Sequence, residues 1–214
     1  MSIFSICNTK FFIVRHAEAL KNLEKMHGGG TQDLTPNGVE GLINSVQILK
    51  EYIDTNNTII YYQREGRSEK TANIMAEELK VDVKKVDDIY GVGLGIIAAL
   101  NEDELQARYP GVAKILKNWK NNGANLDDYP DIPGREHMND FAARILKGMG
   151  SILQPDSNII VVGTTSTINM MSHLLVNDGI FVRECYDFVS FPFAGINGWA
   201  LSCDDVPQKI FSNF

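Results

Sequence analysis

A single histidine, His16, stands at the end of an apolar run in the stretch FFIVRHAEALKN, directly after Arg15. A second arginine, Arg67, also follows an apolar segment closely. Arginine presents a rigid fork of donors that matches a phosphate group, and a neutral imidazole can attack phosphorus and hold the transferred phosphoryl group. These three residues therefore predict an oxyanion site at which phosphoryl transfer could take place.

Other polar residues follow other strand-like runs. Asp87 and Asp88 come after VDVKKV, and Thr164 and Thr165 come after NIIVVG. If these runs are parallel strands, their carboxyl ends meet at one edge of a sheet, where open α/β folds bind ligands. Each residue alone has an ordinary structural explanation, such as a surface charge or a helix cap. Only their joint placement favours a shared site.

The apolar pattern predicts the elements that would bring these side chains together. Short apolar runs predict strands at 10–14, 57–62, 81–86, 158–163 and 195–203, and helical periodicity predicts helices at 35–53, 67–80, 101–120, 136–153 and 166–176. The helical stretch at 101–120 should be two helices that meet near Pro110. Strands that alternate with helices indicate an α/β fold, a three-layer sandwich with a mainly parallel central sheet and helices on both faces. Because 96–135 lacks a strand signal, we expect a helical cap inserted into a single domain spanning 1–214.

Charge and cysteine content narrow the class of protein. A net charge of −7 and a pI near 5.1 argue against a general nucleic-acid surface. We find no signal peptide and no apolar run that would span a bilayer, which predicts a soluble cytoplasmic protein without a membrane partner. The three cysteines are far apart and have no metal-ligand spacing, so we expect buried free thiols in a reducing compartment and no metal.

The polar clusters also carry a family resemblance. IVRHAEALKN resembles the R-H-G-x-x-x-x-N signature of the histidine phosphatase superfamily, the phosphoglycerate-mutase-like proteins, with Arg15, His16 and Asn22 on its positions. Segments similar to later family motifs follow in the same order: DLTPNG at 33–38, REGRSEKTANIMAEEL at 64–79, GREHMNDFAARI at 134–145 and NIIVVGTTST at 158–167. The resemblance implies a phosphohistidine on His16, a phosphate pocket that includes Arg15, Asn22 and Arg67, a small phosphorylated or anionic substrate, and neither metal nor cofactor.

The sequence departs from the family pattern at two positions that carry chemistry. Thr164 replaces the family's second histidine, and Thr165 and Ser166 replace the two glycines that follow it. The family's catalytic glutamate is also absent. Asp87 matches it by the distance to the following glycine, and Asp88 matches it by the distance from the preceding valine. Loss of one preorganised oxyanion donor lowers a rate by roughly 10²–10³.

Three hypotheses follow from these matches and departures. The favoured one is a divergent phosphomonoesterase in which Asp87 or Asp88 is the acid and Thr164 and Thr165 help to bind the substrate. The second is an impaired pseudoenzyme that binds phosphate or another oxyanion. The third is a family member repurposed for a different reaction on a small molecule. Arg64 and His27 are candidates for replacing the missing charge, and no motif identifies the substrate or the oligomeric state.

Overall fold

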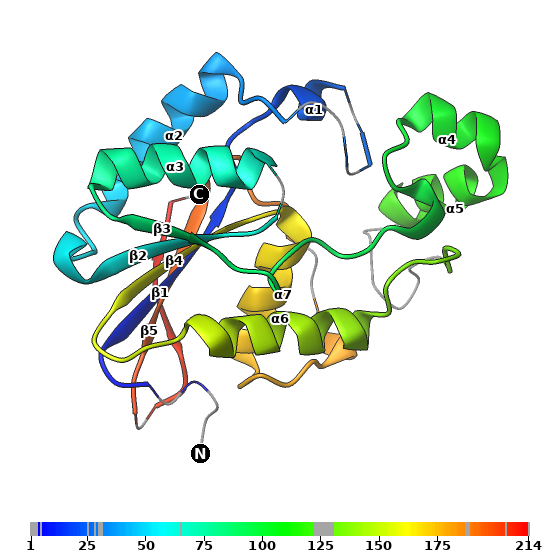
Figure 1. Cartoon of the computed structure of the whole chain (residues 1–214). Helices are drawn as coiled ribbons and strands as arrows, with labels where there is room; N and C mark the ends of the chain where they lie inside the picture. Colours follow the sequence, from blue (N-terminus) through cyan, green and yellow to red (C-terminus); the bar gives the residue numbers. More distant parts are fainter. Residues whose placement is uncertain are drawn as a thin grey trace.

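A six-stranded sheet forms the centre of the fold in the computed structural model (Figure 1). The structure describes residues 4, 6–24, 26–27, 29, 32–64, 66–121, 131–186, 189–203 and 205–213. The strands are β1 (Thr9–Arg15), β2 (Thr58–Tyr62), β3 (Asp82–Lys85), β4 (Asn158–Gly163), β5 (Ile196–Leu201) and β6 (Gln208–Ser212). Their order is β3-β2-β4-β1-β5-β6. The first four are parallel to one another, β5 pairs antiparallel with β1, and β6 pairs antiparallel with β5, so β6 runs in the same direction as the first four.

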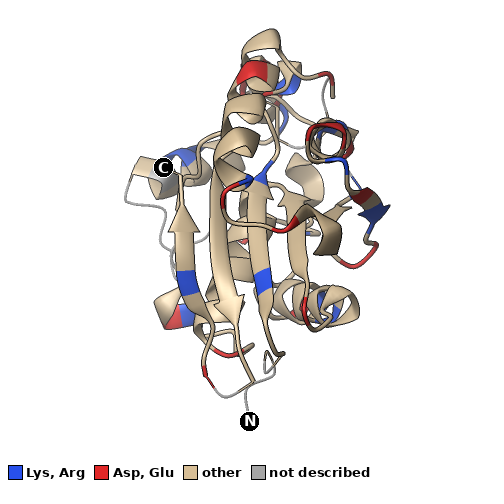
Figure 2. Cartoon of the chain, turned by 90° about the vertical axis from the view of Figure 1, so that its left-hand side faces the viewer, with Lys and Arg blue, Asp and Glu red and all other residues tan. Residues whose placement is uncertain are grey.

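Helices cover both faces of this sheet, as the sequence predicted. The covering helices are α2 (Pro36–Leu49) and α3 (Gly66–Leu79) on one face and α6 (Met138–Ile152) and α7 (Thr165–Val176) on the other (Figure 1). Side chains of β1 alternate between the two faces because successive residues of a strand point in opposite directions. Phe11 and Ile13 join the core under α6 and α7, and Phe12 and Val14 join the core under α2 and α3. The strands β2, β4 and β5 carry no charged residue, whereas the edge strand β3 has the sequence DVKK (Figure 2).

Two helices stand to one side of the sheet, α4 (Glu102–Arg108) and α5 (Pro110–Asn121) (Figure 1). Asn101 and Glu104 form a capping box at the start of α4, because each side chain accepts a hydrogen bond from the other's backbone N–H. A small apolar core joins these helices to flanking segments through Ile97, Leu100, Leu105, Leu116 and Ile132. The cap over 96–135 stays a prediction, and its part at 122–130 lies outside the described residues.

The shorter helical elements connect these layers. They are α1 (Leu20–Leu23) and the 3-10 helices Thr55–Asn57, Gly95–Ile97 and Arg183–Cys185. None of the helices in the described ranges is long and apolar enough to cross a membrane.

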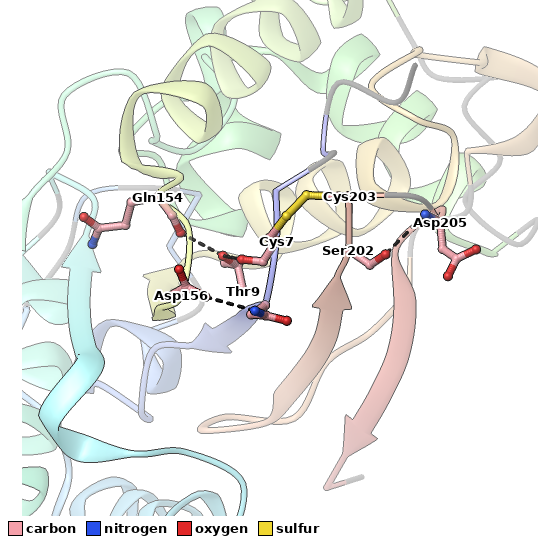
Figure 3. The surroundings of a disulfide bond; sticks show 8 residues. Cys7, Thr9, Gln154, Asp156, Ser202, Cys203 and Asp205 are labelled. Carbon is pink, nitrogen blue, oxygen red and sulfur yellow. Dashed lines mark hydrogen bonds between the residues drawn. A yellow bond between two sulfur atoms is a disulfide. The ribbon is translucent and has the colours of Figure 1, made fainter.

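The state of the cysteines differs from the prediction. Cys7 and Cys203 form a disulfide, with their Cα atoms 4.8 Å apart (Figure 3). The antiparallel register that pairs Thr9 with Leu201 also sets Cys7 opposite Cys203, and no spacing along the sequence reveals this register. Cys185 is free but exposed. The expectation of three buried free thiols is therefore wrong, and a reducing compartment loses its support because disulfides persist in oxidising environments.

Candidate active site

The polar residues that follow β1, β2 and β4 gather at one edge of the sheet. Arg15 pairs with Gly163 in the parallel register, and the backbone N–H of His16 donates to the carbonyl of Gly163 over 3.0 Å. The N–H of Gln63, after β2, donates to the carbonyl of Val162. His16, Gln63 and Thr164 therefore leave the sheet side by side.

His16 is held as a neutral imidazole. Its side chain is buried, with 3% of the residue exposed. Nδ1 lies 2.7 Å from the carbonyl oxygen of Ala17, which can only accept, so Nδ1 carries the proton and Nε2 has the lone pair. Burial first, and then the positive charge of Arg67, lower the pKa of His16 to about 3. The ring is thus uncharged at neutral pH.

Arg67 contacts the lone pair of His16 directly. Its Nε donates to Nε2 of His16 over 3.0 Å, and its Nη1 donates to Oε1 of Gln32 over 2.9 Å. Thr71, one turn further along α3, ties the two segments together. Its hydroxyl donates to the carbonyl of Arg67 and accepts from the N–H of Ala17. The first turn of α3 and the residues after β1 are therefore positioned as one unit.

Arg15 brings a second positive charge to this edge. One guanidinium nitrogen donates to the carbonyl of Phe191, and the guanidinium carbon lies 3.9 Å from the ring centroid of Phe193. In the described part of the chain, Nε of Arg15 is buried and has no hydrogen-bond partner. Burial first, and then Arg67, lower the pKa of Arg15 to about 10, so the group remains cationic at neutral pH. A cation held in this way suits an oxyanion.

Thr164 occupies the N-cap position of α7, but its side chain makes no capping hydrogen bond. Its N–H donates to Oε1 of the buried Gln63 over 3.1 Å, and its hydroxyl lies 3.1 Å from the hydroxyl of Thr167. The Thr167 hydroxyl donates to the same Gln63 oxygen. Thr164 therefore belongs to a polar network at the sheet edge, and Thr165 begins the helix that leaves it.

Asn22 and Lys21 come from the short helix α1. The amide oxygen of Asn22 accepts from the N–H of Ala19 over 3.0 Å, which directs that oxygen to the backbone and makes the NH₂ group the donor for other partners. Lys21 is buried. Its positive charge also lowers the pKa of His16, although by less than burial, Arg67 and Arg15 do. Lys21 was not predicted as a site residue, although its place within the first motif was a usable signal.

The two candidate acids face lysines. Asp87 has a side chain that is 81% exposed and pairs with Lys85 at 3.0 Å. Asp88 pairs with Lys147 at 3.0 Å. Among the contacts of the described residues, neither carboxylate bonds to His16. The structure therefore does not bring the candidate acids together with the histidine.

Glu136 and Arg144, both in the segment GREHMNDFAARI at 134–145, form a bidentate ion pair with N–O distances of 2.7 and 3.0 Å. Arg144 also donates to the carbonyls of Asp88 and Tyr90, and Glu136 accepts from the N–H of Gly93. This pair fixes the backbone of the segment that carries the candidate acids.

The other histidines and Arg64 make no hydrogen bond to His16 among the described residues. His27 lines a cavity of about 440 Å³ beside α4 and α5. His173 accepts from the N–H of Val182 and packs against aromatic rings, which is a structural role. His137 caps α6 by position, and Arg64 is exposed.

The comparisons with known proteins agree on the fold. The family model described as histidine phosphatase superfamily (branch 1) matches residues 11–185. Phosphoserine phosphatase from Entamoeba histolytica, solved with 3-phosphoglyceric acid, is 20% identical with a TM-score of 0.70, covering 96% of this chain and 97% of that one. A mycobacterial glucosyl-3-phosphoglycerate phosphatase solved with VO3 is 17% identical with a TM-score of 0.69, over 96% and 97%. Phosphoglycerate mutase from Bacillus anthracis is 16% identical with a TM-score of 0.71, over 97% and 93%. No curated protein matches the chain.

Proposed function

Because the chain belongs to the histidine phosphatase superfamily, we propose that it is a divergent phosphomonoesterase that acts through a phosphohistidine on His16. One observation carries this proposal. His16 is a buried neutral imidazole whose lone pair on Nε2 faces Arg67, while Nδ1 is anchored on the carbonyl of Ala17. An imidazole in this state is a nucleophile, and the adjacent guanidinium is a donor for the oxygens of its target.

The first chemical step uses these contacts. The phosphoryl group binds between Arg15 and Arg67. The Nε–H of Arg67 then donates its hydrogen bond to a phosphoryl oxygen and no longer to Nε2 of His16. Nε2 then attacks phosphorus, and the bond from phosphorus to the leaving oxygen breaks with its electron pair on that oxygen. The carbonyl of Ala17 stabilises the positive charge that develops on the ring through the Nδ1–H bond. Water later attacks the phosphohistidine and releases phosphate.

Neighbouring donors complete the oxyanion pocket. Asn22 offers its NH₂ group, and the hydroxyl of Thr164 replaces the family's second histidine as a neutral donor. Thr165 opens α7, and the N-terminus of a helix favours an anion because its backbone N–H groups point outward. The substrate is a small phosphorylated or anionic molecule, and the arginines supply the charge that a metal would otherwise supply.

The leaving oxygen needs a proton. Asp87 or Asp88 delivers it as a carboxylic acid, which requires that the carboxyl group first leaves Lys85 or Lys147 and takes a proton from water. The same ion pairs favour a second candidate function, an impaired pseudoenzyme that binds an oxyanion without turning it over. The third hypothesis, another reaction on a small molecule, has no contact that favours it.

Phosphate release from a panel of small phosphomonoesters tests the proposal, with His16→Ala as the matched variant. We expect release by the wild type, none by His16→Ala, and an acid-labile phosphoryl group trapped on the wild type alone. Saturable phosphate binding without turnover would favour the pseudoenzyme. Neither turnover nor phosphate binding would overturn both.

A further inference from the structure

The hydroxyl groups at the start of α7 form a short hydrogen-bonded chain that ends on Gln63. The side-chain oxygen of Gln63 accepts from the backbone N–H of Thr164 over 3.1 Å and from the hydroxyl of Thr167 over 3.0 Å. Because a backbone N–H can only donate, the atom that faces it is the oxygen of the Gln63 amide and not its NH₂ group. An oxygen of this kind only accepts, so the hydroxyl of Thr167 is a donor to it.

This donor role decides which way the next hydrogen bond runs. A hydroxyl has one proton, and that of Thr167 lies on Gln63. The contact of 3.1 Å between the hydroxyl oxygens of Thr164 and Thr167 therefore has Thr164 as its donor. The hydroxyl of Ser166, 3.3 Å from that of Thr164, donates to it in turn, and its oxygen accepts from the N–H of Val92. The proton of the Thr164 hydroxyl is thus directed at Thr167.

The two threonines differ in their accessibility. Thr164 is partly exposed, whereas Thr167 is 0% exposed. Thr164 also follows Gly163, whose carbonyl accepts from the N–H of His16, so Thr164 leaves the sheet beside the histidine. An anion at His16 is therefore placed to contact the hydroxyl of Thr164 and not that of Thr167. For Thr164 to donate to this anion, its proton has to leave Thr167.

We propose that Thr167 is a positioning residue that competes with the anion for the proton of the Thr164 hydroxyl and so lowers the affinity of the pocket for phosphate. The inference rests on the proposed function, because it requires that the phosphoryl group binds at His16. Binding exchanges the hydrogen bond from Thr164 to Thr167 for one to a phosphoryl oxygen, while Thr167 keeps its bond to Gln63. The gain from Thr164 is then smaller by the worth of one neutral hydrogen bond.

Titration with inorganic phosphate, followed by calorimetry, tests this competition. Thr167→Val has nearly the same shape but no acceptor, which leaves the proton of Thr164 available to the anion. We expect its affinity for phosphate to rise roughly threefold to tenfold, the effect of one neutral hydrogen bond. Thr167→Ser keeps the hydroxyl and should restore the affinity of the wild type. In a Thr164→Val background the proton is absent, so adding Thr167→Val should bring no gain.

Thr58→Val supplies a matched control. Thr58 is a buried threonine whose hydroxyl donates to the carbonyl of Asp54 over 2.6 Å. It pairs with Asn158, at the opposite end of β4 from Gly163. Thr58→Val should therefore lower the temperature of thermal unfolding, as Thr167→Val does, but leave the affinity for phosphate unchanged. If thermal unfolding shows that Thr167→Val is not folded, Thr167→Ala removes the same acceptor and takes its place.

The outcomes separate this inference from the proposed function. Saturable phosphate binding by the wild type, with equal or weaker binding by Thr167→Val, overturns the inference and leaves the phosphate pocket intact. A gain that persists in the Thr164→Val background also overturns it, because Thr167 then acts through another group. Absence of phosphate binding by the wild type and by Thr167→Val overturns the phosphate pocket itself, and the inference with it.

Discussion

At the scale of single residues, His16 depends on two hydrogen bonds of opposite sense. The Nδ1–H donates to the carbonyl of Ala17, and Nε2 accepts from Arg67. A protonated ring would lose the second bond and place two cations in contact inside the protein. The same arrangement that keeps the lone pair available therefore also makes protonation of the folded state costly.

This cost predicts a pH dependence of stability. The pKa of His16 is about 3 in the folded protein and about 6.5 when unfolded, so between these values only the unfolded chain takes up this proton. The free energy of unfolding should fall as the pH is lowered from 6.5, by up to about 1.4 kcal/mol per pH unit from this group. Urea unfolding of wild type and His16→Gln across this range isolates the contribution. Parallel pH profiles for the two proteins would contradict it.

Thr164 predicts a gain of function. If the phosphatase proposal is correct, Thr164→His restores a strong oxyanion donor and should raise the rate about tenfold or more. The backbone N–H that binds Gln63 is unaffected by the change. The family's two glycines can be restored in a second variant, but this removes the hydroxyl of Ser166 that accepts from the N–H of Val92. Phosphate release measures both variants, and an unchanged rate in each would show that the missing histidine does not limit turnover.

At the scale of elements, the start of α2 holds the loop that carries the catalytic candidates. Thr35 caps the helix by accepting from the N–H of Gly38, and its own N–H donates to the carbonyl of Glu18. A Cβ added at Gly38 would lie 2.4 Å from the carbonyl oxygen of Glu18, whereas one at Gly41 would meet nothing within 4 Å. The contact with Glu18 therefore requires a glycine at position 38, whereas no contact requires one at position 41.

The pair gives a prediction with an internal control. Gly41→Ala should stabilise the protein by about 0.5–1 kcal/mol, because alanine is the better helix former. Gly38→Ala should destabilise it and lower phosphate affinity, because the backbone at 17–19 must move away from α2. Thermal unfolding and phosphate titration of both variants measure this. Equal effects at the two positions would show that the loop after β1 does not depend on this contact.

Strands could be predicted from the sequence where their buried residues form a recognisable apolar run. β1 and β4 each contain an unbroken buried apolar run, at 11–14 and 159–162, and their ends place Arg15 and Thr164 at one sheet edge. β6 was missed because only one of its residues is buried, which leaves no alternation to detect. The contacts of Gln32 with Arg67 and of Phe193 with Arg15 were also missed, because both come from connecting segments without periodicity.

At the scale of the whole molecule, the disulfide joins the two ends of the chain. Cys7 and Cys203 are 196 residues apart, so the bond closes a very long loop. A crosslink of this kind restricts the unfolded chain far more than the folded one, in which β1 and β5 already hold the two residues together. The stability of the fold should therefore depend on the redox state of its surroundings, even though the bond is remote from the edge that carries His16.

Reduction should lower the free energy of unfolding by about 2–5 kcal/mol. Cys203→Ser should have the same effect, while Cys185→Ser, at the free and exposed cysteine, should leave stability within about 0.5 kcal/mol of wild type. Urea unfolding with and without reductant measures both, and alkylation of the unfolded, unreduced chain should label Cys185 alone. Labelling of all three cysteines would show that the bond does not form. If the bond forms but reductant leaves the unfolding midpoint unchanged, the strand pairing alone holds the ends together, and the protein would keep its fold equally well in a reducing compartment.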